Sequence, residues 1–513
     1  MNLRFESTPV APLPQVDAGT LLRTRAFMPD PDLRAACLAH GAATEQLDRL
    51  FTADALCVTT GQQPGLLTGP LLTIYKAVSA IALARRFEEI LGRPVVPVFW
   101  VAGDDHDYAE ANHVHLVDAR NEIVRLALPD RPAEAPLTPL YREPVGETID
   151  GILAAVVAAT PATEFRDDVL AWLRRHYVPA HDLATAFAGA IAELLGPHGL
   201  VVFRPTHQNA KRAMSPHLVR ALEHATELDR ALGARGAELQ SAGKPTPVHV
   251  GDGATMVMLE CKMGRDRLVL DNGRFHARRS KERYGLDQLR ALAEEEPQRF
   301  SPNVLLRPVI EAAILPTIAY VAGPSELAYF PQCTPLYERL EVVPQVPVAR
   351  WSARAVEGRV GKVLHKYQLT AQDLDLPEGQ LEQRLIRSHM PDEANDAIRV
   401  LRTALQSEYV RLRSAAVAID PTLKRSVESA HHAALAGVKD VEKRILSHLK
   451  QKNEILIHQL AKARHNLFPA GKPQERVFNV VPYLIRYGRT FVDAVLQHAG
   501  EWMSALEPGS GKA

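Results

Sequence analysis

Short apolar runs bounded by Gly and Pro alternate with longer helix-compatible runs up to about residue 330. Continuous apolar runs of this kind are expected for strands that are buried on both faces of a parallel sheet. The clearest runs lie at residues 55–61, 94–103, 199–205 and 315–323. Residues 71–91 have the length of a crossover helix, so the first two runs predict a right-handed βαβ unit. The alternation as a whole predicts an α/β fold with a doubly wound core.

Two intervals are expected to be insertions on this core. A long helical stretch from about 164 to 195 precedes the third apolar run, within an interval at about 120–195. The interval 206–300 holds β-like stretches such as 255–260 and 267–271, with a turn at 271–273. With these insertions included, we expect the core domain to cover residues 1–385.

From about residue 386, apolar residues recur every three or four positions with charged residues between them. Pro421 interrupts the pattern, and a second periodic run reaches Leu467 before Pro469 ends it. Residues 386–470 are therefore predicted to form two long antiparallel helices of a coiled coil. The segment 471–513 is too apolar for a free tail, and we expect it to fold back on the helices or the core.

Composition narrows the class of protein. The chain has 513 residues, 46% of them hydrophobic, and 60 basic residues balance 60 acidic ones. Such a balance gives no bulk attraction to nucleic acid or to an anionic membrane, and charges of both signs alternate on the long helices. The most apolar stretch, 95–103, is shorter than the roughly 20 residues of a membrane helix. No secretory signal is recognisable at the N-terminus, so we expect a cytoplasmic protein.

The four cysteines are Cys37, Cys57, Cys261 and Cys333. They form no Cys-x-x-Cys pair and no close Cys/His group, which argues against a disulfide framework or a structural zinc. We expect all four to be small buried residues, and we assign no metal ligands.

The first polar cluster follows the first predicted strand. Gly61, Gln62, Gln63, Gly65 and Gly69 lead into a helix that carries Lys76. Glycines let backbone amides approach an anion, and a helix N-terminus adds partial positive charge, so a phosphate or carboxylate is the expected guest. A plain tight turn is the alternative, and neither a Walker A motif nor GxGxxG is present.

The second cluster, Asp104-Asp105-His106-Asp107, ends the second predicted strand. Adjacent carboxylates are costly unless a cation, a substrate amine or several donors neutralise them. A metal is possible in principle, because Asp and His are ordinary ligands. Consecutive residues cannot all point at one ion, however, so we favour a site for a substrate amine or sugar hydroxyl.

A third cluster surrounds the last apolar run. Its candidate binding residues are Asn303, Arg307, Ser325, Glu326 and Tyr329. Arg307 offers a planar fork to a carboxylate or phosphate, although it could instead pair with the acidic residue four positions later. Because parallel strands gather their C-terminal ends at one edge, we expect all three clusters to meet in one crevice.

Four strings carry a resemblance to a known family: TGQQPGLLTGPLLTIYKA, PVFWVAGDDHDYAEANHVHL, SPNVLLRPVIEAAILPTIAYVAGPSELAYF and LFPAGKPQERVFNVVPYLIRYG. They occur in this order over nearly the whole chain, which resembles the BshC family of bacillithiol biosynthesis proteins. The chain departs from the pattern at Asp104, where the family usually has Glu, and at Ser325, where it often has Gly.

The resemblance implies a Rossmann-like core similar to class I aminoacyl-tRNA synthetases, and a helical coiled coil used for homodimerisation. It also implies a cysteine ligase, which adds L-cysteine to the amine of glucosaminyl malate. ATP would activate the cysteine carboxylate before the sugar amine attacks. Lys76, Asp105, His106 and Asp107 would then be catalytic, with Trp100 and the remaining cluster residues binding substrate or nucleotide.

The residues are also compatible with two other functional hypotheses. A metal-assisted hydrolase or deacetylase could use Asp104 to Asp107. A scaffold protein without catalytic activity could instead recruit partners through its coiled coil.

Overall fold

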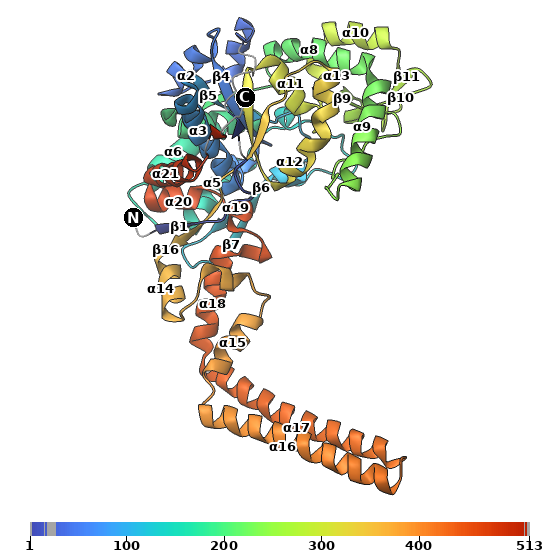
Figure 1. The fold of residues 1–513 in the computed structure, drawn as a ribbon. Helices are drawn as coiled ribbons and strands as arrows, with labels where there is room; N and C mark the ends of the chain where they lie inside the picture. Colours follow the sequence, from blue (N-terminus) through green and yellow to red (C-terminus); the bar gives the residue numbers. More distant parts are fainter. Residues whose placement is uncertain (1–2, 15, 18–26, 507, 510–513) are drawn as a thin grey trace. The chain divides into compact units, whose positions relative to one another are not determined.

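The computed structural model describes residues 3–14, 16–17, 27–506 and 508–509, and within it the chain divides into two compact units (Figure 1). The core unit comprises Leu3–Ala355 together with the segment that starts at Pro473. The helical unit comprises Val356–Lys472. The division therefore falls after Ala355, earlier in the chain than the boundary at 385 that periodicity suggests.

A six-stranded sheet organises the core unit, with the strand order β15-β14-β4-β5-β8-β3. Its five neighbouring parallel strands are β15 (Val346–Ala349), β14 (Thr317–Ala322), β4 (Leu56–Gln62), β5 (Val95–Val101) and β8 (Val201–Phe203). The short β3 (Cys37–Leu38) pairs antiparallel with β8 at one edge. β4, β5, β8 and β14 lie at the four predicted apolar runs, and the predicted doubly wound fold is confirmed.

The crossover from β4 to β5 is α3 (Leu71–Leu91), which is buried over most of its length. From β4 the chain builds the sheet outward through β5 and β8, and it then returns to place β14 on the other side of β4. The topological switch point therefore lies between β4 and β14. Ligands of doubly wound folds bind at such a point, beyond the carboxyl ends of the strands.

The first insertion contains a hairpin and three helices. The hairpin pairs β6 (His113–Val117) with β7 (Ile123–Ala127), and α5 (Thr148–Ala159) follows it. The single helical stretch predicted at 164–195 is wrong, because α6 (Arg166–His176) and α7 (Leu183–Leu195) are separate. The chain leaves the helix at Tyr177, whose buried hydroxyl accepts a hydrogen bond from the Thr68 amide at 2.7 Å.

The second insertion begins with α8 (Gln208–Glu223) and α9 (Ala225–Ser241). It continues into a five-stranded sheet with the order β12-β11-β10-β9-β13. These strands are β9 (Ala254–Cys261), β10 (Gly264–Asp271), β11 (Arg274–Ala277), β12 (Arg283–Tyr284) and β13 (Phe300–Pro302), with α10 (Leu286–Glu295) before β13. Figure 1 shows this sheet and α9 on one side of the core unit.

After the helical unit, the chain rejoins the core unit through α19 (Gln474–Val477), α20 (Val481–Tyr487) and α21 (Thr490–Ser504). Both α19 and α21 pack on α3, and Phe491, Val495 and Ala499 of α21 are buried in the same core. The apolar character of this segment is thus used to cover the crossover helix.

In the helical unit, α16 (Asp392–Ile419) and α17 (Leu423–Lys452) lie side by side as a hairpin (Figure 1). The break predicted at Pro421 lies between them. The second periodic run is not one helix, because α17 ends before Asn453 and α18 (Glu454–Leu467) starts after it. α18 packs with α14 (Gly358–Lys366) and α15 (Gln380–Ser388) around a separate small core. Among the described residues, no helix combines the length and apolar character needed to cross a membrane.

Candidate functional site

A cavity of about 570 Å³ opens at the carboxyl ends of β4, β5 and β14, with β10 and the end of β13 forming a further wall. Its volume lies within the range of small-molecule sites. The predicted site residues that line it are Gly61, Gln62, Gln63, Lys76, Trp100, Asp104, Asp105, His106, Asn303, Arg307, Ser325, Glu326 and Tyr329. The predicted residues Gly65, Gly69 and Asp107 are not part of its lining.

The glycines of the first cluster serve close packing. Gly61 lies within β4, where a Cβ would meet the Trp100 carbonyl oxygen at 3.0 Å. Gly65 and Gly69 approach so closely that a Cβ on Gly65 would stand 2.9 Å from the Gly69 Cα. Gly69 also has φ +69° and ψ −160°, a conformation that other residues avoid.

Three amides of this loop donate hydrogen bonds within the protein. Thr68 donates to Tyr177, Gly69 donates to the Leu66 carbonyl, and Leu71 donates to the Phe478 carbonyl at 2.7 Å. The side-chain amide of Asn479 holds the loop from the other side by donating to the Leu67 and Gly69 carbonyls. These three amides are therefore not free to bind an anion.

Lys76 is also engaged. Its Nζ lies 2.6 Å from Glu326 Oε2, and it donates to the Gly61 carbonyl at 2.7 Å and to Gln62 Oε1 at 3.2 Å. Burial lowers the pKa of Lys76, and the Glu326 carboxylate opposes that effect. Burial works against ionisation of Glu326, but Lys76 and Arg307 outweigh it and lower the pKa of this carboxyl. The pair ties the start of α3 to α12 (Pro324–Tyr329).

Arg307 stands at the start of α11 (Arg307–Ile314). It forms an ion pair of 2.8 Å with Glu311, four residues on, and its guanidinium lies 4.7 Å above the Tyr320 ring. Glu311 also accepts a hydrogen bond from Thr59. Asn303 is engaged too, because its side-chain oxygen accepts the amides of Leu305 and Leu306 before α11. The alternative predicted for Arg307, pairing within its own helix, is what the structure has.

The carboxylates of the second cluster have separate partners. Asp104 forms an ion pair of 2.5 Å with Lys211, a fully buried residue of α8 that sequence reasoning missed. Asp105 accepts the amides of His106 and Asp107, and Asp107 caps the one-turn helix α4 (Tyr108–Ala111). Gln63 donates to the Asp107 carbonyl at 2.7 Å, which joins the first and second clusters.

His106 lies between charges of both signs. Its Nδ1 is 4.0 Å from Asp105 Oδ1 and 3.4 Å from Arg265 Nη1. Burial and then Arg265 lower the pKa of His106, against the opposing effect of Asp105 and Asp107. The lowered pKa favours the neutral imidazole at neutral pH, with Nδ1 accepting from Arg265.

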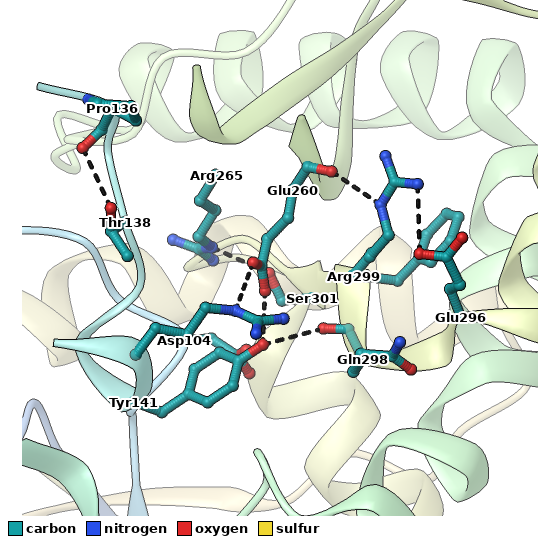
Figure 2. A network of polar contacts seen from close by, with 12 residues as sticks. Asp104, Pro136, Thr138, Tyr141, Glu260, Arg265, Glu296, Gln298, Arg299 and Ser301 are labelled. Atoms are coloured by element: carbon teal, nitrogen blue, oxygen red, sulfur yellow. Dashed lines mark hydrogen bonds and ion pairs between the residues drawn. The ribbon is translucent and has the colours of Figure 1, made fainter. Parts of the chain in front are cut away.

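A segment of the first insertion braces this strand-end loop. The amides of Leu140 and Tyr141 donate to the carbonyls of Asp105 and Gly103, at 2.7 and 3.1 Å. Figure 2 shows the Tyr141 hydroxyl directed at Glu260 of β9, where it donates at 2.6 Å. Arg142 forms an ion pair with the same carboxylate at 2.7 Å. The loop after β5 is thus connected to the sheet of the second insertion.

Arg265 and Arg267 of β10 also line the cavity and were missed by sequence reasoning. Arg265 donates to Ser301 Oγ at 2.9 Å and to the Pro302 carbonyl at 2.7 Å, and Figure 2 shows it beside Ser301. A signal existed in the alternation Arg-Asp-Arg, which places two basic residues on one face of a strand. Nothing in the sequence, however, shows that this face turns toward the end of β5.

The metal-site alternative finds no support in this geometry. Within the described ranges, no three His, Cys, Asp or Glu side chains are grouped as they would be around a metal ion. Asp104, Asp105 and Asp107 instead point at Lys211, at backbone amides and at the N-terminus of α4. The cysteines of the chain are free; Cys37, Cys57 and Cys333 are buried as predicted, while Cys261 is only partly buried.

Two family models together match most of the chain. Residues 33–350 match the family model described as "Bacillithiol biosynthesis BshC, N-terminal Rossmann-like domain". Residues 353–502 match the model described as "Bacillithiol biosynthesis BshC, C-terminal coiled-coil domain".

Relatives from several bacteria align over most of the chain. A protein of Heliobacterium modesticaldum is 33% identical, over 90% of this chain and 84% of its own length. A protein of Koribacter versatilis is 32% identical, over 90% of this chain and 85% of its own length. Both carry the name "Putative cysteine ligase BshC".

Proposed function

Because the chain belongs to the BshC family of bacillithiol biosynthesis proteins, we propose that it is a ligase that joins L-cysteine to the amine of glucosaminyl malate. The name of its relatives supports the ligase class. The observation that carries the proposal is the position of His106 beside Asp105 in the cavity at the end of β5. A substrate amine bound there would have a carboxylate to attract it and a base to remove its proton before it reacts.

Amide formation needs a neutral amine and an activated carboxyl group. The carboxylates of Asp105 and Glu110, which both line the cavity, attract the protonated amine of the acceptor. Neutral His106 accepts the proton at Nδ1, as a general base, once the bound acceptor has displaced the contact with Arg265. The amine nitrogen then attacks the carbonyl carbon of the activated cysteine and the C–N bond forms. The bond to the activating group breaks, that group leaves as an anion, and the nitrogen releases its second proton to solvent.

ATP is the proposed source of that activating group. The position of the cavity at the switch point of a doubly wound sheet supports nucleotide binding there. Lys76 does not add a free cation for the phosphates, because Glu326 already neutralises it. Lys76 has a structural role in this proposal: through Glu326 and the Gly61 carbonyl it connects the ends of β14 and β4 beside the cavity.

The test is to incubate the purified full-length protein with cysteine, glucosaminyl malate and ATP. Mass spectrometry for bacillithiol and an assay for the nucleotide product report on amide formation and on activation separately. We expect both products from the wild type, loss of bacillithiol in His106→Ala, and full activity in the matched surface variant His249→Ala, whose imidazole is exposed. Absence of both products from the wild type would reject the ligase.

We also propose a homodimer formed through the helical unit in the cytoplasm. Large apolar side chains are exposed on α16 and α17, including Leu401, Leu412 and Val441, each at least 50% accessible. Such side chains are expected to be covered by a partner coiled-coil surface. Light scattering should give twice the chain mass, falling to the chain mass in Leu401→Glu/Leu412→Glu. A monomeric wild type at micromolar concentration would contradict the dimer.

A further inference from the structure

Apart from the exposed Arg476, the lysine and arginine side chains that line the cavity, together with Lys211 beside it, fall into two groups. In the first group, each cation has a carboxylate within 4 Å: Lys76 has Glu326, Lys211 has Asp104, Arg307 has Glu311, and Arg350 has Glu475. These four pairs are internally neutral once Glu311 has lost its proton, which happens above about pH 7. None of them offers a net charge to a ligand.

Arg265 and Arg267 form the second group. Arg265 donates to neutral acceptors, namely Ser301, the Pro302 carbonyl and the His106 ring. In the part of the chain that the structure describes, the Arg267 guanidinium has neither an ion pair nor a hydrogen bond. Both residues line the cavity and neither forms an ion pair, although the Asp104, Asp105 and Glu260 carboxylates lie near enough to act on the charge of Arg265.

The backbone of β10 places the two guanidiniums together. Positions 265 and 267 lie on the same face of the strand, because side chains alternate along it. Arg267 is paired across the sheet with Met258, which also lines the cavity. Each guanidinium is at least partly buried, and in such surroundings like charges repel more strongly than in bulk water. A bound anion would relieve that repulsion.

We propose that Arg265 and Arg267 form an anion subsite that binds a group with two negative charges, either a dicarboxylate or a polyphosphate. Two planar guanidinium forks on neighbouring positions match the oxygens of such a group bidentately. The subsite deepens the proposed function and rests on it for the identity of the anion. That anion is then the malyl end of the acceptor or the phosphates of the nucleotide.

The contact between Arg265 and His106 favours the acceptor. The two side chains are 3.4 Å apart, so the anion subsite adjoins the place where the acceptor amine is deprotonated. A substrate that carries an amine at one end and a dicarboxylate at the other would reach both at once. Lys76 offers no equivalent anion site, because Glu326 already neutralises its charge.

Arg267→Gln is the variant of choice, because it breaks no ion pair or hydrogen bond that holds the fold. Calorimetry on the full-length protein would measure binding of L-malate, with L-lactate as the monocarboxylate comparison, and of pyrophosphate. Loss of charge-assisted hydrogen bonds should weaken binding of the matching dianion about tenfold or more. Arg274→Gln on the neighbouring strand β11, exposed and outside the cavity, should bind as the wild type does.

The outcomes distinguish the two sources of the anion, the acceptor and the nucleotide. Weakened malate binding assigns the subsite to the acceptor, and weakened pyrophosphate binding assigns it to the nucleotide. Equal binding of both ligands by wild type and Arg267→Gln, or no binding of either by the wild type, overturns the subsite. These measurements need no turnover, so a failure of the ligase assay leaves them intact. Arg267→Lys keeps the positive charge but loses the planar guanidinium. Its affinity for the dianion should therefore lie between those of the wild type and Arg267→Gln.

Discussion

Lys76 of α3 and Glu326 of α12 form an ion pair with 2.6 Å between Nζ and Oε2, and both side chains are largely buried. Each member has further partners: Lys76 donates to the Gly61 carbonyl, and Glu326 accepts from the Tyr320 hydroxyl and the Gly323 amide. The pair therefore connects the ends of β4 and β14, the two strands that flank the switch point. It acts as a structural tie at the place where a ligand is expected.

Removing one partner of this pair should be costly, because the other is left charged and buried. We expect Lys76→Met to lower the free energy of unfolding by about 3–5 kcal/mol. The double variant Lys76→Met/Glu326→Gln should recover a large part of that loss, since no isolated charge remains. Urea denaturation of wild type, both single variants and the double variant measures the coupling. Additive losses would show that the two charges do not depend on each other.

The sequence predicted the sheet and the meeting of its polar clusters, because continuous apolar runs and their ends are local properties. It did not predict which charges neutralise one another. Lys76 and Glu326 are separated by most of the core unit in sequence, and Lys211 reaches Asp104 from a helix of an insertion. Pairing of this kind follows from tertiary packing, which no local pattern records. The same reason kept Arg265 and Arg267 out of the predicted site.

Gly69 should be intolerant of substitution. Its φ of +69° and ψ of −160° belong to a region that is essentially restricted to glycine, so Gly69→Ala should cost about 1–3 kcal/mol. Gly151 is a suitable control, because it is exposed within α5 and a Cβ there meets nothing within 4 Å. Gly151→Ala should be neutral or stabilising by up to about 1 kcal/mol. Thermal unfolding of the two variants compares them, and equal melting temperatures would contradict the role of the Gly69 conformation.

Glu311 should make stability fall as pH rises. Burial raises the pKa of Glu311 to about 7, with Arg307 and Thr59 opposing the shift. Between pH 4.5 and 7 the folded state holds a proton that the unfolded state has released, so its advantage shrinks as pH increases. The slope is at most about 1.4 kcal/mol per pH unit.

The measurement is the unfolding free energy of wild type and Glu311→Gln at several pH values from 5 to 8. The difference, wild type minus variant, should decrease with pH across this window and level off above it. A difference that is constant, or one that increases with pH, would show that Arg307 keeps Glu311 ionised throughout.

His106 should titrate below its ordinary value of 6.5, because burial and the nearby Arg265 guanidinium both disfavour the imidazolium. NMR titration of the His106 ring would give this pKa directly. In Arg265→Met the positive neighbour is lost, so the pKa should rise, while Arg274→Met should leave it unchanged. If His106 is the base of the ligase, the acid limb of kcat/KM for the acceptor should move in the same direction. A limb that stays fixed while the NMR pKa moves would assign the base to another group.

Tyr141 should be a positioning residue. Loss of its hydroxyl should lower kcat more than an equally destabilising change elsewhere in the core unit does. Tyr141→Phe removes the 2.6 Å hydrogen bond to Glu260 but keeps the ring and the backbone contact with Gly103. We expect a stability loss of about 1–3 kcal/mol, and a lower kcat with an unchanged KM for cysteine. Tyr284→Phe is the matched control, since Tyr284 donates to Glu282 at 2.7 Å away from the cavity lining. It should lose similar stability and keep full activity. Equal loss of kcat in both variants would mean that Tyr141 contributes only to folding, because a general weakening of the core unit would then account for both.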